Sequence, residues 1–252
     1  MSGNCSGILP VDIGLYKKEL SDQSKDICIL TSIDVAAGIG ILKEDKFFVE
    51  IETIAYFTTR VALLDILVVG GEPVSITFAT SLSNNYYEEI KAGILEALGE
   101  WSVEINNQIT GSTEDNFKTK QTSLSIMVTG LSRENRLNWL QANKGDNLFI
   151  VGDPVVGEEV LKNKNKIINP EVFQILMEDK STKNLIPVGS GGALMRIKAL
   201  MNKTGLKYNS LNEELEKKSA GPATAILLVS DKDINYYQNK LNIPITQLGN
   251  LN

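Results

Sequence analysis

Stretches rich in β-branched and other apolar residues recur along the first half of the chain, separated by polar and glycine-containing segments. Runs of this length and composition predict β-strands, which we place at residues 26–36, 48–51, 74–82, 103–109 and 123–131. The segment 109–130, "ITGSTEDNFKTKQTSLSIMVTG", is then expected to carry a polar loop at a sheet edge, where two of these strands meet.

Two helices are predicted between these strands. The first spans 54–69 and is closed by Gly70 and Gly71, with Pro73 just beyond, which together form a strong stop signal. The second follows Ser83, a residue type that caps helices well. Its apolar residues recur at spacings of four, four and three and define one buried face: Ile90, Ile94, Leu98 and Trp101.

The second half of the chain mixes strands and helices in a different order. Strands are predicted at 146–152, 184–188 and 219–231, and helices at 169–179, 193–202, 212–218 and 232–241. Asn169 is placed to cap its helix, with Pro170 in the first helical position. The whole chain therefore belongs to the α+β class, with two domains at residues 1–135 and 136–252.

Composition is that of a soluble protein with a sizeable core, at 252 residues and 42% hydrophobic. The longest nearly uncharged run, 53–71, contains Arg60 and Asp65 and does not suit a membrane span. The N-terminus lacks a basic start followed by an apolar core, so we expect a cytoplasmic protein. Cys5 and Cys28 lack the spacing of a zinc site or a disulfide framework.

Charge is unevenly distributed around a net value of −6, and the chain contains no histidine. Residues 1–135 carry 19 acidic and 10 basic side chains, a net charge of −9, whereas the rest carry 12 acidic and 15 basic, a net charge of +3. An acidic first half disfavours nucleic acid as a partner but suits hard divalent cations, which prefer carboxylate oxygen. Without histidine, acid–base chemistry must use carboxylates, lysines or hydroxyls.

Two carboxylates stand in unusual places. Asp34 ends an apolar strand and precedes the small, flexible "AAGIG", where a backbone could approach a ligand closely. Asp65 lies within an apolar helix, where an unpaired carboxylate would cost several kcal/mol, so it needs a cation or hydrogen bonds. Arg60 is a poor partner for it, because five residues turn a helix by about 140° beyond a full circle. An exposed or ion-paired structural position for Asp65 remains the alternative.

The polar loop adds further candidate ligands. Glu114 with Asp115, and Lys118 with Lys120, would each be ordinary surface charges if taken alone. Carboxylates from three elements together with lysines on one loop are what a magnesium and polyphosphate site requires. The standard phosphate-loop, dinucleotide, nucleophile-elbow and HExxH motifs are absent from the sequence.

Three successive segments, "ILTSIDVAAGIG", "YFTTRVALLDILVVGGEPVSITFATSL" and "ITGSTEDNFKTKQTSLSIMVTGL", resemble the ATP-site segments of the aminoimidazole ribonucleotide synthetase superfamily. This PurM-like family includes thiamine-monophosphate kinase and selenophosphate synthetase. The resemblance implies an N-terminal domain that dimerises by joining sheets into a β-barrel, a C-terminal α/β domain, and bound ATP and Mg²⁺.

The resemblance also implies roles for individual residues. Asp34, Asp65 and Glu114 would be catalytic and hold the metal, although the family's usual acid is replaced here by Ser112. ATP would contact a further set of residues: Asp26, Ser112, Thr113, Asn116, Lys118, Lys120 and Gln121. The acceptor substrate would contact residues of the second domain: Ser190, Gly191, Lys218 and Ser219. Ordinary turns are the alternative for that last group.

The combination of "GSTEDNFKTKQT", "IPVGSGG" and "KSAGPAT" resembles the α-ribazole kinase branch most. The function expected from it is transfer of a phosphoryl group from ATP to a small nucleoside-like acceptor, by a homodimer that binds neither nucleic acid nor membranes. The alternatives are a thiamine-monophosphate kinase-like enzyme and an ATP-binding protein without catalysis.

Overall fold

The computed structural model describes residues 7–9, 13–17, 27–105 and 108–252. The chain divides into two compact units, Met1–Leu137 and Asn138–Asn252. This border lies two residues beyond the one placed from the sequence. Among the described residues, no helix is long and apolar enough to cross a membrane.

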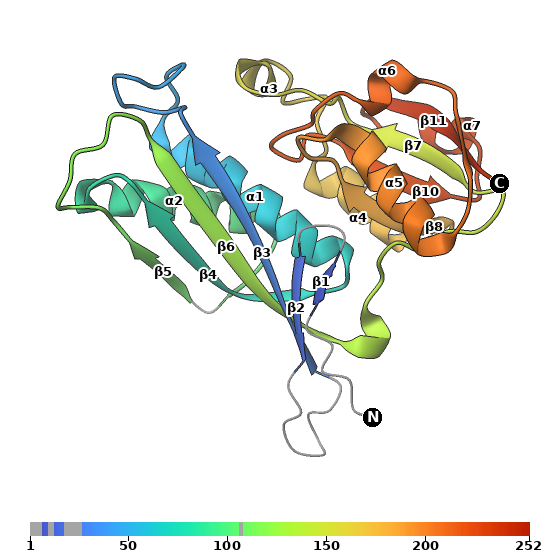
Figure 1. The fold of residues 1–252 in the computed structure, drawn as a ribbon, viewed down its shortest axis with the longest axis horizontal. Coiled ribbons are helices and arrows are strands. Elements are labelled where there is room, and N and C mark those ends of the chain that lie inside the picture. Colours follow the sequence, from blue (N-terminus) through green and yellow to red (C-terminus); the bar gives the residue numbers. More distant parts are fainter. Residues whose placement is uncertain (1–6, 10–12, 18–26, 106–107) are drawn as a thin grey trace. The chain divides into compact units, whose positions relative to one another are not determined.

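The first unit is built on a six-stranded sheet in the order β1-β2-β3-β6-β4-β5 (Figure 1). Neighbouring strands are antiparallel except β4 and β5, which are parallel. The strands are β1 (Gly7–Leu9), β2 (Ile13–Lys17), β3 (Ile27–Ala37), β4 (Glu72–Thr80), β5 (Ile109–Ser112) and β6 (Ser123–Arg133).

Helices α1 (Ile51–Val68) and α2 (Tyr87–Glu100) cover one face of this sheet (Figure 1). Strand β3 shows the resulting alternation: Cys28 and Leu30 are buried against the helices, whereas Ile33 and Val35 on the opposite face are 62% and 58% exposed. Successive side chains of a strand point to opposite faces, so β3 has one covered face and one open apolar face.

Three local predictions in this unit are wrong. Residues 48–51 form no strand, because Phe48 makes only an isolated bridge to Gly40 and the chain enters α1 at Ile51. Ser83 precedes a short 3₁₀ turn, Asn84–Tyr86, and makes no side-chain capping bond. The strand expected at 103–109 instead begins at Ile109 and runs parallel to β4, so β5 and β6 do not pair with each other.

The second unit contains a five-stranded antiparallel sheet in the order β8-β10-β7-β11-β9. Its strands are β7 (Asn147–Val151), β8 (Thr182–Pro187), β9 (Tyr208–Ser210), β10 (Ile226–Ser230) and β11 (Ile245–Leu251). Its helices are α3 (Glu158–Lys162), α4 (Pro170–Glu178), α5 (Gly192–Thr204), α6 (Glu213–Glu216) and α7 (Ile234–Gln238). Every residue of strand β10, which lies between β8 and β7, is buried. The mixed α+β class expected from the sequence is confirmed.

In the second unit, a predicted helix start is found in the structure, whereas the C-terminal strand was not predicted. The Asn169 side chain accepts a hydrogen bond from the Val172 amide at 2.9 Å and Pro170 opens α4, so this predicted cap is confirmed. The β-branched residues Ile245 and Thr246 open the C-terminal strand β11, which we did not predict.

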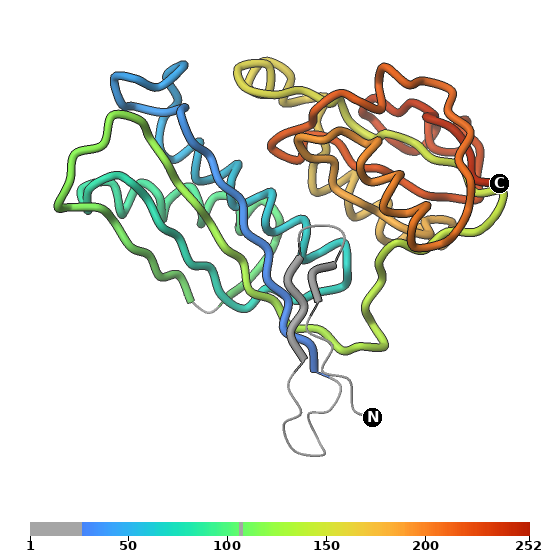
Figure 2. The backbone as a smooth tube through the Cα atoms, in the orientation of Figure 1, coloured from blue at the N-terminus to red at the C-terminus, as the bar shows by residue number. Residues whose placement is uncertain are grey.

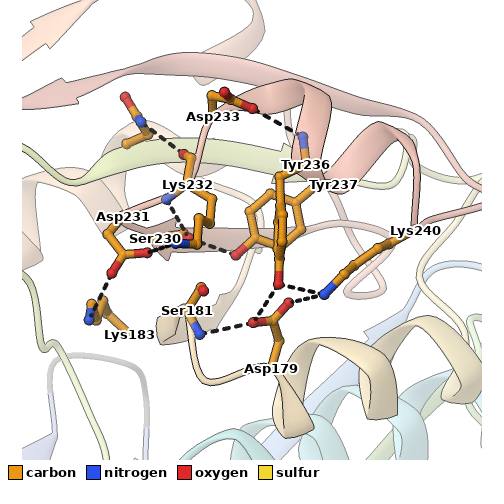
Figure 3. Close-up of polar contacts among 11 residues, drawn as sticks. Asp179, Ser181, Lys183, Ser230, Asp231, Lys232, Asp233, Tyr236, Tyr237 and Lys240 are labelled. Atoms are coloured by element: carbon orange, nitrogen blue, oxygen red, sulfur yellow. Dashed lines mark hydrogen bonds and ion pairs between the residues drawn. The ribbon is translucent and has the colours of Figure 1, made fainter.

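A polar cluster fastens α7 to the turn between α4 and β8 (Figure 3). The buried carboxylate of Asp179 accepts hydrogen bonds from the Lys240 ammonium at 2.8 Å, from the Ser181 amide at 2.9 Å and from the Tyr236 hydroxyl at 3.3 Å. The Lys240 ammonium also lies 4.0 Å from the Tyr236 ring centroid. These contacts are satisfied within the unit, which is the pattern of a structural clamp.

Candidate functional site

Asp65 is buried in α1, with 6% of its surface exposed, and faces strand β3. The hydroxyl of the buried residue Ser32 donates a hydrogen bond to its Oδ2 at 2.9 Å. Asp34 follows two residues further along the same strand and therefore lies on the same face of the sheet as Ser32. The fold thus brings the two carboxylates predicted from the sequence to one side of the sheet, where α1 packs.

The environment of Asp34 is unfavourable to a negative charge. Partial burial raises the pKa of its carboxyl group to about 6, against an opposing hydrogen bond from the Val35 backbone. A carboxyl group with such a pKa exchanges a proton near neutral pH, as a general base must. A cation nearby would favour the ionised form instead.

Arg60 lies in the same helix as Asp65 but contacts other groups. Its fully buried guanidinium lies 5.9 Å from the Phe57 ring centroid and 5.8 Å from the Trp101 ring centroid, next to the C-terminal end of α2. Burial lowers its pKa to about 10, while the nearby Tyr56 and Glu100 side chains oppose that shift. These contacts join α1 to α2.

The loop 113–122 holds itself in shape. Glu114 accepts hydrogen bonds at Oε1 from the backbone amides of Asn116 and Phe117, at 2.8 and 3.1 Å. Asp115 accepts from the Asn84 amide at 2.8 Å and from the Thr113 hydroxyl at 2.7 Å. Those bonds hold the pKa of Asp115 below its usual value. The predicted ligand Glu114 therefore has one oxygen engaged within its own loop.

A second loop, residues 38–49, is fastened to the end of the first, and Figure 2 shows both at the same end of the sheet. Asp45 accepts hydrogen bonds from the Thr122 amide at 2.8 Å and from its hydroxyl at 2.6 Å. Lys120 pairs with Glu44 at 3.2 Å, and the Gln121 amide nitrogen donates to the Glu44 carbonyl at 2.9 Å. Lys120 and Gln121, predicted to contact ATP, therefore also tie the two loops together.

The structure describes some, but not all, of the side chains that were predicted to bind a metal ion or ATP. Within the part of the chain that the structure describes, no group of three or more carboxylate or cysteine side chains is arranged to hold a metal ion. Asp26 lies outside the described residues. Asp34 and Asp65 are oxygen donors of the kind that Mg²⁺ prefers, and this ion commonly uses one or two carboxylates together with phosphate oxygens. The donor chemistry therefore fits magnesium bound together with a nucleotide.

Other predicted ATP contacts lie in the first unit near these loops. Ser112 is the last residue of β5 and is exposed, and it aligns with Ala79 of β4. Thr113 follows it and supports Asp115. Asn116 and Lys118 are exposed on the loop.

The predicted acceptor contacts meet within the second unit. The backbone amide of Ala220, which follows Ser219, donates to the Gly189 carbonyl at 3.2 Å, next to Ser190. Gly192 has a φ of +68°, and a Cβ there would lie 2.4 Å from the Glu216 carbonyl oxygen. Only glycine allows the turn containing Ser190 and Gly191 to approach the segment containing Lys218 and Ser219 so closely.

Several residues of these sites were not predicted from the sequence. Ser32 has the clearest signal, because the period of two places it on the buried side of β3 with Cys28 and Leu30. A buried polar residue needs a partner, and two positions before Asp34 it indicates a polar site. Asp45 and Thr122 gave no local signal, since their contact spans 77 positions.

Residues 24–132 match the family model described as AIR synthase related protein, N-terminal domain. The match lies within the first unit and covers most of it. The chain matches no curated protein sequence.

Solved structures resemble the chain over most of its length. The thiamine monophosphate kinase of Aquifex aeolicus has a TM-score of 0.60 and 17% identity, covering 89% of this chain and 85% of that one. A structure described as AaThiL complexed with AMPPCP and TMP has a TM-score of 0.61 and 16% identity, covering 97% of this chain and 85% of that one. At such identities the likeness shows the fold alone.

A longer protein shares the same fold. The Thermotoga maritima PurL complexed with ATP has a TM-score of 0.55 and 14% identity. It covers 96% of this chain, which spans 37% of the PurL chain.

Proposed function

We propose that this protein is an ATP-dependent phosphotransferase. The observation that carries the proposal is the placement of Asp34 and Asp65 on one covered face of an AIR synthase-related sheet, with Ser32 supporting Asp65 at 2.9 Å. The polar loop 113–122 lies at the end of the sheet to which β3 runs. Carboxylate oxygens and a lysine-bearing loop are the groups that a magnesium–nucleotide complex needs.

Each residue has a role in this proposal. Asp34 and Asp65 would hold Mg²⁺, which when bound neutralises charge on the phosphate oxygens. Lys118 and Lys120 provide positive charge for those oxygens, and Glu114 holds the loop that presents them. Asp34 is also the first candidate to accept the proton of the acceptor hydroxyl at a carboxylate oxygen.

The proposed acceptor is a small nucleoside-like alcohol, with α-ribazole as the first compound to test. This part rests on the resemblance of "GSTEDNFKTKQT", "IPVGSGG" and "KSAGPAT" and on the meeting of the Gly189 turn with Ala220. Thiamine monophosphate is the second compound, since the similar Aquifex aeolicus protein is a thiamine monophosphate kinase.

The proposed assembly is a homodimer formed through the open face of the first sheet. The side chains of β3 on that face are uncharged and include Ile33 and Val35, exposed by 62% and 58%. Two copies of this face can pack with their apolar β3 side chains in contact, and this apolar area would leave water.

The test is an ATP-dependent phosphate transfer assay with purified protein, Mg²⁺ and either α-ribazole or thiamine monophosphate. We expect a phosphorylated product with α-ribazole that requires both ATP and Mg²⁺, and a loss of turnover of about 100-fold or more in Asp65→Asn. Absence of product with both acceptors, from protein that binds MgATP, would instead support the non-catalytic alternative.

A further inference from the structure

Phe117 is the most exposed of the large hydrophobic side chains in the described residues, with 77% of its surface accessible. It lies in the loop 113–122, and its neighbours Asn116 and Lys118 are exposed as well. A single exposed apolar residue is common on protein surfaces and does not by itself indicate a site. The hydrogen bonds that fix this loop are a second observation, and they support a binding role for the ring.

The backbone that carries Phe117 is fixed on both sides of the ring. The Phe117 amide donates to Glu114 Oε1 at 3.1 Å, and on the far side the Thr119 hydroxyl donates to the Ser81 carbonyl at 3.1 Å. Asp115 binds the Asn84 amide at 2.8 Å. The loop is thus tied to the connection between β4 and α2, so the backbone at Phe117 need not be ordered when a ligand binds, which lowers the entropic cost of binding.

The residues around Phe117 indicate which kind of ligand this part of the loop could bind. The residues next to Phe117 are polar and exposed, so the ring is not part of an apolar patch of the size that a protein partner requires. Lys118 follows Phe117 in the sequence, so an exposed positive charge lies on the same loop as the ring, whereas Lys120 is paired with Glu44 at 3.2 Å. A ligand that combines a flat π-system with negative charge suits both groups, and a nucleotide has both.

We infer that Phe117 stacks on the purine base of the bound nucleotide and that Lys118 adds charge attraction to the same ligand. This inference rests on the proposed function, because it names which part of the ATP molecule the loop recognises. Stacking on an aromatic side chain requires only a π-face, so Phe117 contributes affinity for the base and nothing for a bare polyphosphate chain.

The experiment compares two ligands by calorimetry in the presence of Mg²⁺: ATP, and inorganic tripolyphosphate, which has no base. In Phe117→Ala we expect the affinity for ATP to fall about 10-fold or more and the affinity for tripolyphosphate to stay within about 2-fold. Phe117→Trp should keep ATP affinity, since indole also stacks. Because the ring is exposed, the thermal midpoint of the Phe117→Ala protein should not change.

The matched control is Phe48→Ala, which removes another exposed phenylalanine, 67% accessible, from the loop before α1. It should bind both ligands like the wild type. The inference is overturned if Phe117→Ala binds ATP like the wild type, loses both ligands equally, or loses no more than Phe48→Ala. Wild-type protein that binds neither ligand would overturn the proposed function as well, whereas failure of the inference alone leaves wild-type ATP binding intact.

Discussion

The Ser32 hydroxyl donates a hydrogen bond to the Asp65 carboxylate at 2.9 Å, joining strand β3 to helix α1 across 33 positions of sequence. Both residues are buried, with 1% and 6% of their surfaces exposed. A buried carboxylate costs several kcal/mol unless hydrogen bonds or ions compensate it, so this bond is one reason that Asp65 is tolerated inside an apolar helix. It also fixes the carboxylate on the side of the sheet where Asp34 lies.

Removal of this bond should destabilise the first unit. We expect Ser32→Ala to lower the free energy of unfolding by about 1–3 kcal/mol, because a buried acceptor loses a donor. Urea unfolding at neutral pH measures the change. A double-mutant cycle with Asp65→Asn should give a coupling energy of at least about 0.5 kcal/mol. Strictly additive effects would show that the two side chains do not depend on each other.

Asp34 should make stability depend on pH in the absence of metal. Its folded-state pKa is raised from 3.8 to about 6, so the stability associated with its neutral form is present below about pH 3.8 and lost as the pH rises through about 6. Asp34→Asn stays neutral, and should therefore be more stable than wild type at pH 8, by about 1–3 kcal/mol, and equal to it at pH 4. Chemical denaturation in chelator at both pH values tests this, and an equal difference at both would contradict it.

The Asp179 cluster should show the opposite pH dependence. Burial alone would raise the pKa of Asp179, but its hydrogen bonds from Lys240, Ser181 and Tyr236 lower it overall. The resulting stability is present above the unfolded-state pKa of about 3.9 and is lost as the pH falls through the lower folded-state value. Asp179→Asn should therefore cost about 1–2 kcal/mol at pH 7 and progressively less in acid.

The matched control for that cluster is Asp231→Asn. Asp231 pairs with Lys183 at 3.3 Å and with Lys232 at 3.8 Å, but its side chain is 45% exposed. Exposed ion pairs contribute at most about 1 kcal/mol, so the control should change stability less. A control effect as large as that of Asp179→Asn would show that burial does not distinguish the two carboxylates.

The open sheet face should decide the oligomeric state. We expect light scattering to give about twice the chain mass of 27.6 kDa for the wild type and a single chain mass for Ile33→Lys, which places charge on a face that is to be buried. Leu211→Lys changes another exposed apolar residue, in the second unit, and should remain dimeric. A wild type that is monomeric at all concentrations would contradict the proposed dimer.

The sequence predicts elements best where local signals are strong. Three predicted features depend on only a few neighbouring residues: the glycine pair after α1, the apolar repeat along α2 and the cap at Asn169. Each of them is found in the structure. The strand predicted at 48–51 is wrong because apolar and β-branched composition does not distinguish a strand from a short segment that leads into a helix, which begins here at Ile51.

From the sequence, only those site residues can be predicted whose chemical type is unusual for their local surroundings. Asp34 and Asp65 could be identified because a carboxylate among apolar residues conflicts with its surroundings. The Asp45–Thr122 contact depends on how distant segments meet, which no local pattern encodes. The parallel pairing of β5 with β4 has the same cause.

The most direct test of the central claim is calorimetric titration of ATP into the wild type and Asp34→Asn, each with excess Mg²⁺ and with excess chelator. The claim is that Asp34 and Asp65 hold a magnesium–nucleotide complex. It predicts ATP binding by the wild type in Mg²⁺, a loss of at least about 10-fold in chelator, and a similar loss in Asp34→Asn even with Mg²⁺ present. Equal ATP affinity in Mg²⁺ and in chelator, or an Asp34→Asn protein that binds like the wild type in Mg²⁺, would contradict it.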